Sequence, residues 1–133
     1  MKIYIASSWR NQHGVEMLTT LLRNEGHEVL SWVENNYGEG HGPDAADFEQ
    51  WVKTDAAQRS FLLDVDAATR CNLVIYYGPA GTDAWAEVGA AWACGVPVFA
   101  LWAKGEPSGL MRKMVQRWFY RVPDLLQGIR GLG

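Results

Sequence analysis

Cysteine is scarce in this sequence, and the charges of opposite sign nearly cancel. The 133 residues include two cysteines, Cys71 and Cys94, which are too few and too far apart for a disulfide framework or a structural zinc site. We therefore expect a reduced, cytoplasmic protein without a metal ion or other cofactor. Twelve basic against fifteen acidic residues leave a formal charge of −3, which gives no electrostatic argument for a nucleic-acid polymer as partner.

Long apolar segments are missing as well. The short N-terminal apolar run at residues 3–6 turns polar at once, unlike a signal peptide. The longest uncharged run, residues 88–103, is interrupted by Gly95-Val96-Pro97 and is shorter than the ~20 apolar residues that a membrane span needs. We expect a soluble protein with no membrane partner.

Several enzyme fingerprints are absent. The sequence has no Walker A loop, no Gly-x-Ser-x-Gly elbow and no spaced set of zinc ligands, which disfavours P-loop and serine-hydrolase chemistry. The run Gly38-Glu39-Gly40-His41-Gly42 is not a dinucleotide fingerprint, because no strand-to-helix turn holds it. We interpret residues 34–44 as a loop whose glycine run forms a mobile lid, with His41 a bystander.

The composition that is present suits one globular domain spanning residues 1–133. Hydrophobic residues make up 48% of the chain and charged residues 20%, enough to bury a core. Seven Trp, five Tyr and four Phe are many for this length. They indicate an aromatic-lined cleft or an oligomer interface in addition to the core.

Apolar periodicity predicts strands and helices in alternation. Strands are expected at residues 3–6, 27–33, 73–77, 97–102 and 118–122, and helices at 14–25, 44–70 (interrupted), 82–94, 110–116 and 123–129. Gly26 and Gly95 follow two of these helices as terminating residues would. Such alternation implies right-handed crossovers and a doubly wound α/β fold, a flavodoxin- or Rossmann-like parallel sheet of about five strands with helices on both faces.

In a doubly wound sheet the ligand lies beyond the carboxyl ends of the strands, near the switch in strand order. Residues 7–11, 34–44 and 78–87 follow such ends. Glu87 is the most informative residue there, because it is the only charged side chain between Asp83 and Lys104. A carboxylate among apolar neighbours must reach a cleft, be paired or have a raised pKa, which suits a nucleophile or acid–base group. The alternative is an exposed helix residue.

Other candidates have a functional and a structural interpretation each. Asp83 lies four residues before Glu87 on the same helix face, yet it could simply favour the helix dipole. Ser7, Ser8 and Arg10 sit where a helix begins and could bind an anion such as phosphate, or merely cap the helix.

Two acidic residues precede the third strand. Asp64 and Asp66 lie beside apolar residues on the predicted helix there, and one of them could hydrogen-bond ligand hydroxyls. The alternative for both is a solvated helix face.

Three segments together resemble the nucleoside 2-deoxyribosyltransferase-like superfamily. They are Tyr4-Ile5-Ala6-Ser7-Ser8-Trp9-Arg10-Asn11, then Asp64 eight residues before Asn72, then Gly81-Thr82-Asp83-Ala84-Trp85-Ala86-Glu87-Val88-Gly89 followed by Gly95-Val96-Pro97-Val98. The resemblance covers roughly residues 1–102, and the Glu-x-Gly step is its most specific part. The superfamily includes base-exchanging transferases and nucleoside 5′-monophosphate N-glycosidases.

The resemblance implies roles for these residues. Glu87 matches the family's nucleophile, which attacks C1′ of the sugar, and Asp64 matches the carboxylate that holds the sugar hydroxyls. Ser8 and Arg10 match positions that contact a 5′-phosphate. The remaining expected substrate-binding residues are Tyr4, Ser7, Gly81 and Asp83.

Some positions depart from the family pattern. Gly81 stands where the transferases often carry a carboxylate and the hydrolases a serine, and Asp83 would repel a phosphate. Arg10 nevertheless favours a 5′-monophosphate over a free nucleoside. The alternative functions are a non-catalytic nucleotide-binding or sensing module and an NAD glycohydrolase-like enzyme. The apolar and aromatic run at residues 111–120 predicts a homodimer or larger homo-oligomer.

Overall fold

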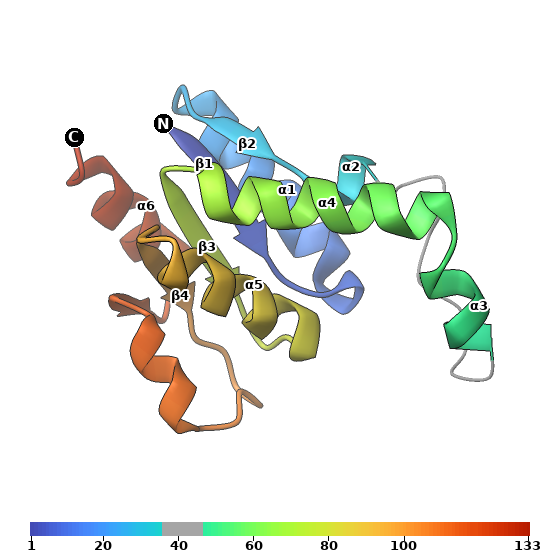
Figure 1. Cartoon of the computed structure of the whole chain (residues 1–133). Coiled ribbons are helices and arrows are strands. Elements are labelled where there is room, and N and C mark those ends of the chain that lie inside the picture. The colour runs from blue at the N-terminus through green and yellow to red at the C-terminus, as the bar shows by residue number, and fades with distance from the viewer. Residues whose placement is uncertain (36–46) are drawn as a thin grey trace.

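The computed structural model describes residues 1–35 and 47–133. Within them, five strands form one sheet in the order β2-β1-β3-β4-β5, with every neighbouring pair parallel (Figure 1). The strands are β1 (Lys2–Ala6), β2 (Glu28–Leu30), β3 (Leu73–Tyr77), β4 (Val98–Leu101) and β5 (Arg117–Phe119). The predicted α/β class and parallel sheet are confirmed.

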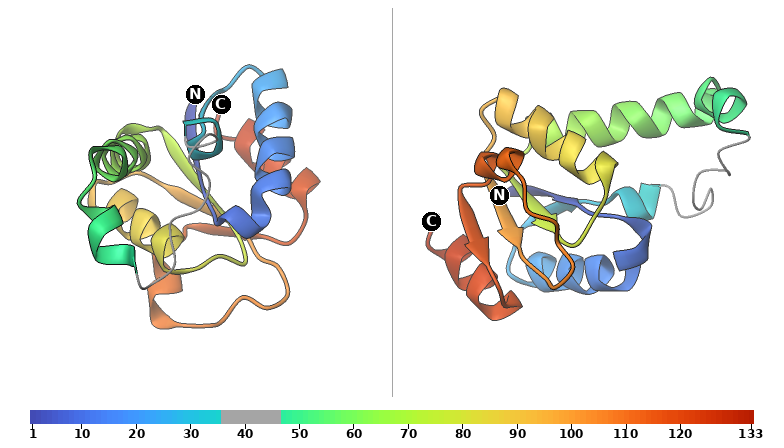
Figure 2. Two further views of the ribbon diagram at one scale, coloured as in Figure 1. Left: turned by 90° about the vertical axis from the view of Figure 1, so that its right-hand side faces the viewer. Right: turned by 90° about the horizontal axis from the view of Figure 1, so that it is seen from below.

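Helices cover both faces of this sheet. Helices α4 (Asp55–Arg70) and α5 (Thr82–Ala93) lie on one face, and α1 (Gln12–Asn24) and α6 (Val122–Arg130) lie on the other (Figure 2). Shorter helical segments are η1 (Trp9–Asn11), α2 (Trp32–Asn35), α3 (Phe48–Val52) and η3 (Leu110–Met114). As predicted, Gly26 and Gly95 follow α1 and α5 with positive φ angles of 93° and 78°, a conformation that favours glycine.

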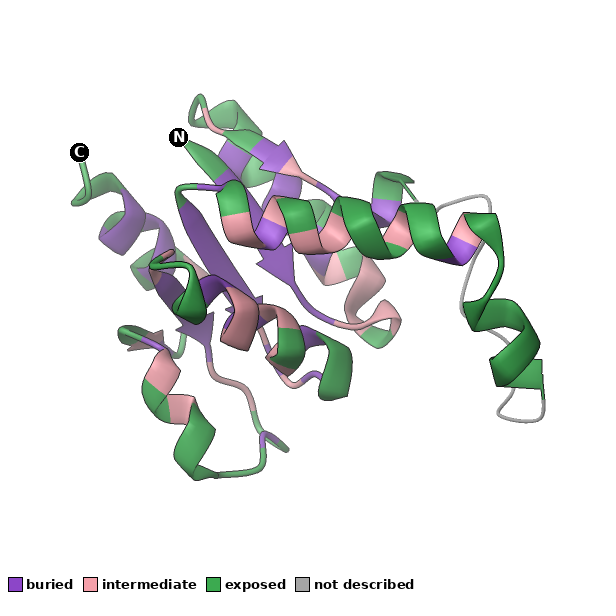
Figure 3. Cartoon of the chain, viewed as in Figure 1, coloured by how far each residue is buried: buried purple, intermediate pink, exposed green. Residues whose placement is uncertain are grey.

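The core is built on the central strands. Side chains of β1, β3 and β4 are buried on both faces of the sheet, as Figure 3 shows in purple. Such strands have nearly continuous apolar sequences because helices exclude water from both sides. Within the described residues, every helix is too short or too polar to cross a membrane.

The second predicted strand is too long. Strand β2 ends at Leu30, and residues assigned to it by periodicity begin helix α2 instead. Two side-chain hydrogen bonds explain the change: the Ser31 hydroxyl accepts from the Glu34 amide at 3.3 Å, and the Trp32 indole donates to the Ile5 carbonyl at 2.7 Å. The glycine run with His41, interpreted above as a lid, lies outside the described residues.

The long predicted helix is interrupted at Thr54. Its hydroxyl accepts a hydrogen bond from the Ala57 amide at 3.1 Å and so caps the start of α4, separating it from α3. Near the C-terminus, the helix predicted at 110–116 is the 3₁₀ segment η3, and the last strand begins and ends earlier than predicted, at Arg117 and Phe119.

Candidate active site

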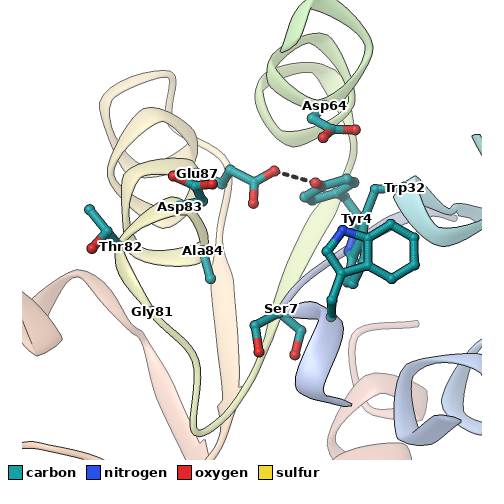
Figure 4. A pocket seen from close by; sticks show the side chains of 11 residues that line it. Tyr4, Ser7, Trp32, Asp64, Gly81, Thr82, Asp83, Ala84 and Glu87 are labelled. Atoms are coloured by element: carbon teal, nitrogen blue, oxygen red, sulfur yellow. Dashed lines mark hydrogen bonds between the residues drawn. The ribbon is translucent and has the colours of Figure 1, made fainter. Parts of the chain in front are cut away.

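A cavity of about 440 Å³ opens beyond the carboxyl ends of β1 and β3. Strand β1 lies between β2 and β3, so the strand order reverses at this point, which is where doubly wound sheets bind ligands. The cavity is lined by Tyr4, Ser7, Ser8, Trp9, Trp32, Asp64, Gly81, Thr82, Asp83, Ala84 and Glu87 (Figure 4). Seven of the eight predicted site residues therefore meet in one place.

Glu87 projects from α5 toward β1. Tyr4, fully buried on β1, donates its hydroxyl hydrogen to the Glu87 carboxylate (Figure 4). Burial raises the pKa of Glu87 to about 8; the hydrogen bond from Tyr4 opposes this rise, and the charges of Asp64 and Asp83 add to it. A raised pKa together with a defined orientation is typical of a carboxyl group in a functional site.

Asp64 faces the same cavity from α4. Burial, and to a lesser degree the charge of Asp83, raises the pKa of Asp64 to about 6. Its Oδ1 atom is buried and has no hydrogen-bond partner among the described residues. A ligand hydroxyl would satisfy this oxygen. Asp66 instead is exposed and pairs with Arg70 at 2.8 Å, so the structure separates the two predicted candidates.

The serines after β1 differ in their contacts. The Ser7 hydroxyl donates to the Tyr77 carbonyl at 2.8 Å and accepts from Asn11 Nδ2 at 3.1 Å. Asn11 also donates to the Pro79 carbonyl at 2.8 Å, so this pair ties the loop after β1 to the loop after β3. The Ser8 hydroxyl is buried with no partner in the described part of the chain, which leaves it available to a ligand.

Arg10 is the predicted site residue that the structure does not bring to the cavity. It lies exposed on η1 and is not among the lining residues. Asp83 does line the cavity, together with Asp64 and Glu87. Among the described residues, the charged side chains that line the cavity are therefore all acidic. Gly81 caps the N-terminus of α5, and a Cβ atom there would meet nothing within 4 Å.

Two tryptophans form a wall of the cavity that sequence analysis did not assign. The rings of Trp9 and Trp32 meet edge to face, with centroids 4.9 Å apart and an interplanar angle of 84°. The abundance of aromatic residues predicted such a wall without indicating its members. Trp32 was hidden by its place in the overlong predicted strand, and Thr82 had no distinguishing pattern.

A second, mainly apolar cavity of about 630 Å³ adjoins the first. Both cavities are lined by Asp64, Asp83 and Glu87, so the acidic cluster lies between them. The apolar side comes from α3, α4 and α5, with Trp51, Val52, Ala57, Phe61, Val65, Ala86 and Ala90. The arrangement suits a ligand with a polar part at the acidic cluster and an apolar ring beside it.

No protein-family model and no curated protein matches the chain. Solved structures do match it. A 2-deoxyribosyltransferase from Bacillus psychrosaccharolyticus aligns with a TM-score of 0.68 and 23% identity, over 94% of this chain and 90% of that one. A CMP N-glycosidase from Clostridium botulinum aligns at 0.62 and 19%, over 98% and 99%. A conserved protein from Enterococcus faecalis aligns at 0.68 and 17%, over 100% and 99%. The chain shares the fold of these solved structures, which is the fold that the resemblance in its sequence implies.

Proposed function

We propose that this protein is an enzyme that cleaves or transfers the N-glycosidic bond of a nucleoside, with Glu87 as the nucleophile. The observation that carries the proposal is the partly buried Glu87 carboxylate, held by Tyr4 in a cavity at the strand-order switch. The similarity in fold to a 2-deoxyribosyltransferase and a CMP N-glycosidase supports the same reaction class.

In the proposed reaction, the ionised Glu87 carboxylate attacks C1′ of the sugar. The C1′–N bond breaks with its electron pair going to the base, which takes up a proton from solvent and leaves. Water or a second base then displaces Glu87 from the glycosyl ester. Positive charge develops on the sugar in both steps, and the neighbouring Asp64 and Asp83 stabilise it.

One carboxylate oxygen and one hydroxyl of the cavity are placed to bind the hydroxyl groups of a sugar. Asp64 Oδ1 and Ser8 Oγ are buried without partners in the described residues, and both line the cavity. We propose that they bind sugar hydroxyls, with Ser7 holding the loop that carries Ser8. The apolar cavity beside Glu87 is proposed to receive the base.

We propose a free nucleoside as the preferred substrate. The sequence favoured a 5′-monophosphate because of Arg10, yet Arg10 lies outside the cavity and three carboxylates line it. A phosphate dianion placed there would face the charges of Asp64 and Asp83. It would also raise the pKa of Glu87 further and so leave less of the proposed nucleophile ionised. The acidic cavity therefore favours the opposite substrate from the one that the motif alone predicts.

One experiment separates the candidate functions. The purified protein is incubated with ribonucleosides, deoxyribonucleosides, their 5′-monophosphates and NAD, and free base or nicotinamide is followed by chromatography. Base release supports the proposal, and a new nucleoside formed after a second base is added identifies transfer. Release of nicotinamide alone supports the NAD glycohydrolase alternative. Saturable binding without release supports a nucleotide-binding module.

We also propose that the active form is a homo-oligomer. Apolar side chains on α3 and α4 are between 39% and 59% exposed: Phe48, Trp51, Val52, Phe61, Leu62 and Leu63. In the run at residues 111–120, Val115 and Phe119 are buried in the core, whereas Met111 and Tyr120 are 57% and 74% exposed. A second copy on the α3–α4 face would cover the apolar cavity and exclude water from Glu87.

A further inference from the structure

A buried carboxylate lies outside the proposed active site. Glu106, in the loop between β4 and η3, has a side chain with 0% exposure. Its Oε2 accepts a hydrogen bond from the Tyr76 hydroxyl at 2.6 Å, and its Oε1 accepts from Trp85 Nε1 at 3.3 Å and Arg112 Nη2 at 3.2 Å. Sequence analysis gave no indication of this role, because Gly105-Glu106-Pro107 resembles an ordinary surface turn.

These contacts extend to the loop that precedes α5. The Tyr76 hydroxyl also accepts from the Ala80 amide at 2.9 Å and from Trp85 Nε1 at 3.0 Å. The Tyr76 and Trp85 rings pack with centroids 4.5 Å apart, and the Arg112 guanidinium lies 4.1 Å from the centre of the Trp85 ring. The loop and the first turn of α5 are thus held by one connected group of side chains.

The close approach of Glu106 requires a glycine in this loop. A Cβ atom on Gly78 would lie 2.6 Å from Glu106 Oε2 and 3.1 Å from the Leu101 carbonyl oxygen. The backbone oxygen cannot move aside easily, so any larger residue would displace either the loop or the carboxylate. The position of the Glu106 carboxylate therefore requires glycine at position 78.

Trp85 links this group to the proposed nucleophile. Trp85 and Glu87 are two residues apart on α5, so at about 100° per residue their side chains leave nearly opposite sides of the helix. The hydrogen bond from Trp85 to Tyr76 fixes the rotation of α5 about its axis. With that rotation, Glu87 on the opposite side of the helix points toward Tyr4. We propose that Glu106 is a positioning residue, which through Tyr76 and Trp85 fixes the loop at residues 78–81 and the first turns of α5. This inference rests on the proposed role of Glu87.

The chemistry of the contacts requires a carboxylate at position 106. Tyr76, Trp85 and Arg112 all donate to it, and a carboxylate only accepts. The amide of a glutamine would direct its own N–H groups at one of these donors and leave a buried hydrogen without an acceptor. Arg112 balances the buried charge, so removing either partner leaves the other unpaired.

Three conservative variants test the proposal: Glu106→Gln, Tyr76→Phe and Trp85→Phe. Glu106→Gln and Tyr76→Phe keep the side-chain shape, and Trp85→Phe keeps a smaller aromatic ring. Each variant removes hydrogen bonds of the group. Matched controls are Glu28→Gln, Tyr120→Phe and Trp92→Phe, which change exposed residues, Trp92 being on the same helix. The measurements are kcat and KM for base release, the pH dependence of kcat/KM, and amide hydrogen exchange along the chain.

The test variants are expected to lower kcat at least tenfold while KM changes less than threefold. Amide exchange should accelerate at residues 78–88 and stay unchanged in β1 and β3. The midpoint of the rise in kcat/KM should move to lower pH. A Glu87 side chain that is held less firmly is more exposed to water, which stabilises its ionised form and lowers its pKa. The controls should match the wild type in all three measurements.

Unchanged kcat, pH dependence and exchange in the test variants would overturn the proposal, as would faster exchange spread evenly over the whole chain. If Glu106→Gln does not fold, Trp85→Phe decides by the same measurements. A wild type that releases no base would refute the proposed function alone, because the exchange pattern at residues 78–88 still tests the positioning.

Discussion

Tyr4 donates a hydrogen bond to Glu87 across 83 positions of the sequence. The contact forms because β1 lies beside β3, and α5, which follows β3, packs over both strands. Tyr4 opposes the effect of burial on Glu87 by stabilising the ionised carboxylate. The ionisation of the proposed nucleophile is therefore controlled from a different element of the fold.

Replacing the proposed nucleophile should abolish turnover without unfolding the protein. Glu87→Gln keeps the shape of the side chain but cannot form the glycosyl ester, so kcat should fall by about three orders of magnitude or more. Base release is measured on the best substrate found, and folding by circular dichroism. Glu28→Gln, at an exposed position of β2, is the control. Near-normal base release by Glu87→Gln would show that another group attacks the sugar.

The rate should rise with pH. Because Glu87 must be ionised to attack and its pKa is about 8, kcat/KM should increase toward a plateau above about pH 8. Tyr4→Phe removes the hydrogen bond that lowers this pKa, so the rise should move to higher pH. Asp64→Asn removes a charge that raises it, so the rise should move to lower pH. Shifts in the same direction for both variants would contradict the assignment.

Stability should respond to pH through the same carboxyl. Between the ordinary pKa of 4.5 and about 8, folded Glu87 holds a proton that the unfolded chain has released, so the free energy of unfolding falls as pH rises. Glutamine does not ionise, so the Glu87→Gln variant does not lose stability with rising pH through this residue. Its stability relative to the wild type should therefore grow from pH 4.5 to pH 8, by a few kcal/mol in order of magnitude. Urea unfolding at several pH values measures it, and a constant difference would refute the burial of an ionisable Glu87.

Local sequence patterns sufficed for most of the fold. The apolar run of β3 and the glycines after α1 and α5 are short-range signals, and the structure agrees with them. The strand predicted at 27–33 failed because the Trp32 indole bonds to Ile5 on another strand. Apolar alternation carries no information about such a distant partner.

In the candidate site too, residues with a local sequence signal were predicted, and residues placed by distant contacts were not. Glu87 stood out because its neighbours are uncharged, and Asp64 matched a family spacing. The direction of Arg10 depends on how η1 leaves the sheet, which the motif does not specify. Glu106 had no local signal, since its burial results from contacts with three separate segments of the chain.

Arg10 should not distinguish phosphorylated from free substrates. It lies outside the cavity, so Arg10→Ala should change kcat/KM for a nucleoside and for its 5′-monophosphate by the same factor. The wild type should prefer the nucleoside, because Asp64, Asp83 and Glu87 face the substrate. A larger loss on the monophosphate would instead support the phosphate contact that the motif suggested. Asp83→Asn should improve the relative rate on the monophosphate.

The α3–α4 face should join two copies of the chain. Light scattering at micromolar concentration should give a multiple of 14.9 kDa. Leu62→Asp places a charge on this face without altering a residue that lines either cavity, and it should yield the monomer. Leu21→Asp, an equivalent change at an exposed leucine of α1, should leave the oligomer intact.

Base release should depend on the proposed oligomer. If the second copy excludes water from the apolar cavity, the monomeric Leu62→Asp variant should lose most of its base release while Leu21→Asp keeps it. Specific activity of the wild type should also fall on dilution, in step with the loss of oligomer. A wild-type mass of 14.9 kDa at every concentration would refute the assembly. Full activity in a monomeric Leu62→Asp would show that one copy completes the site alone.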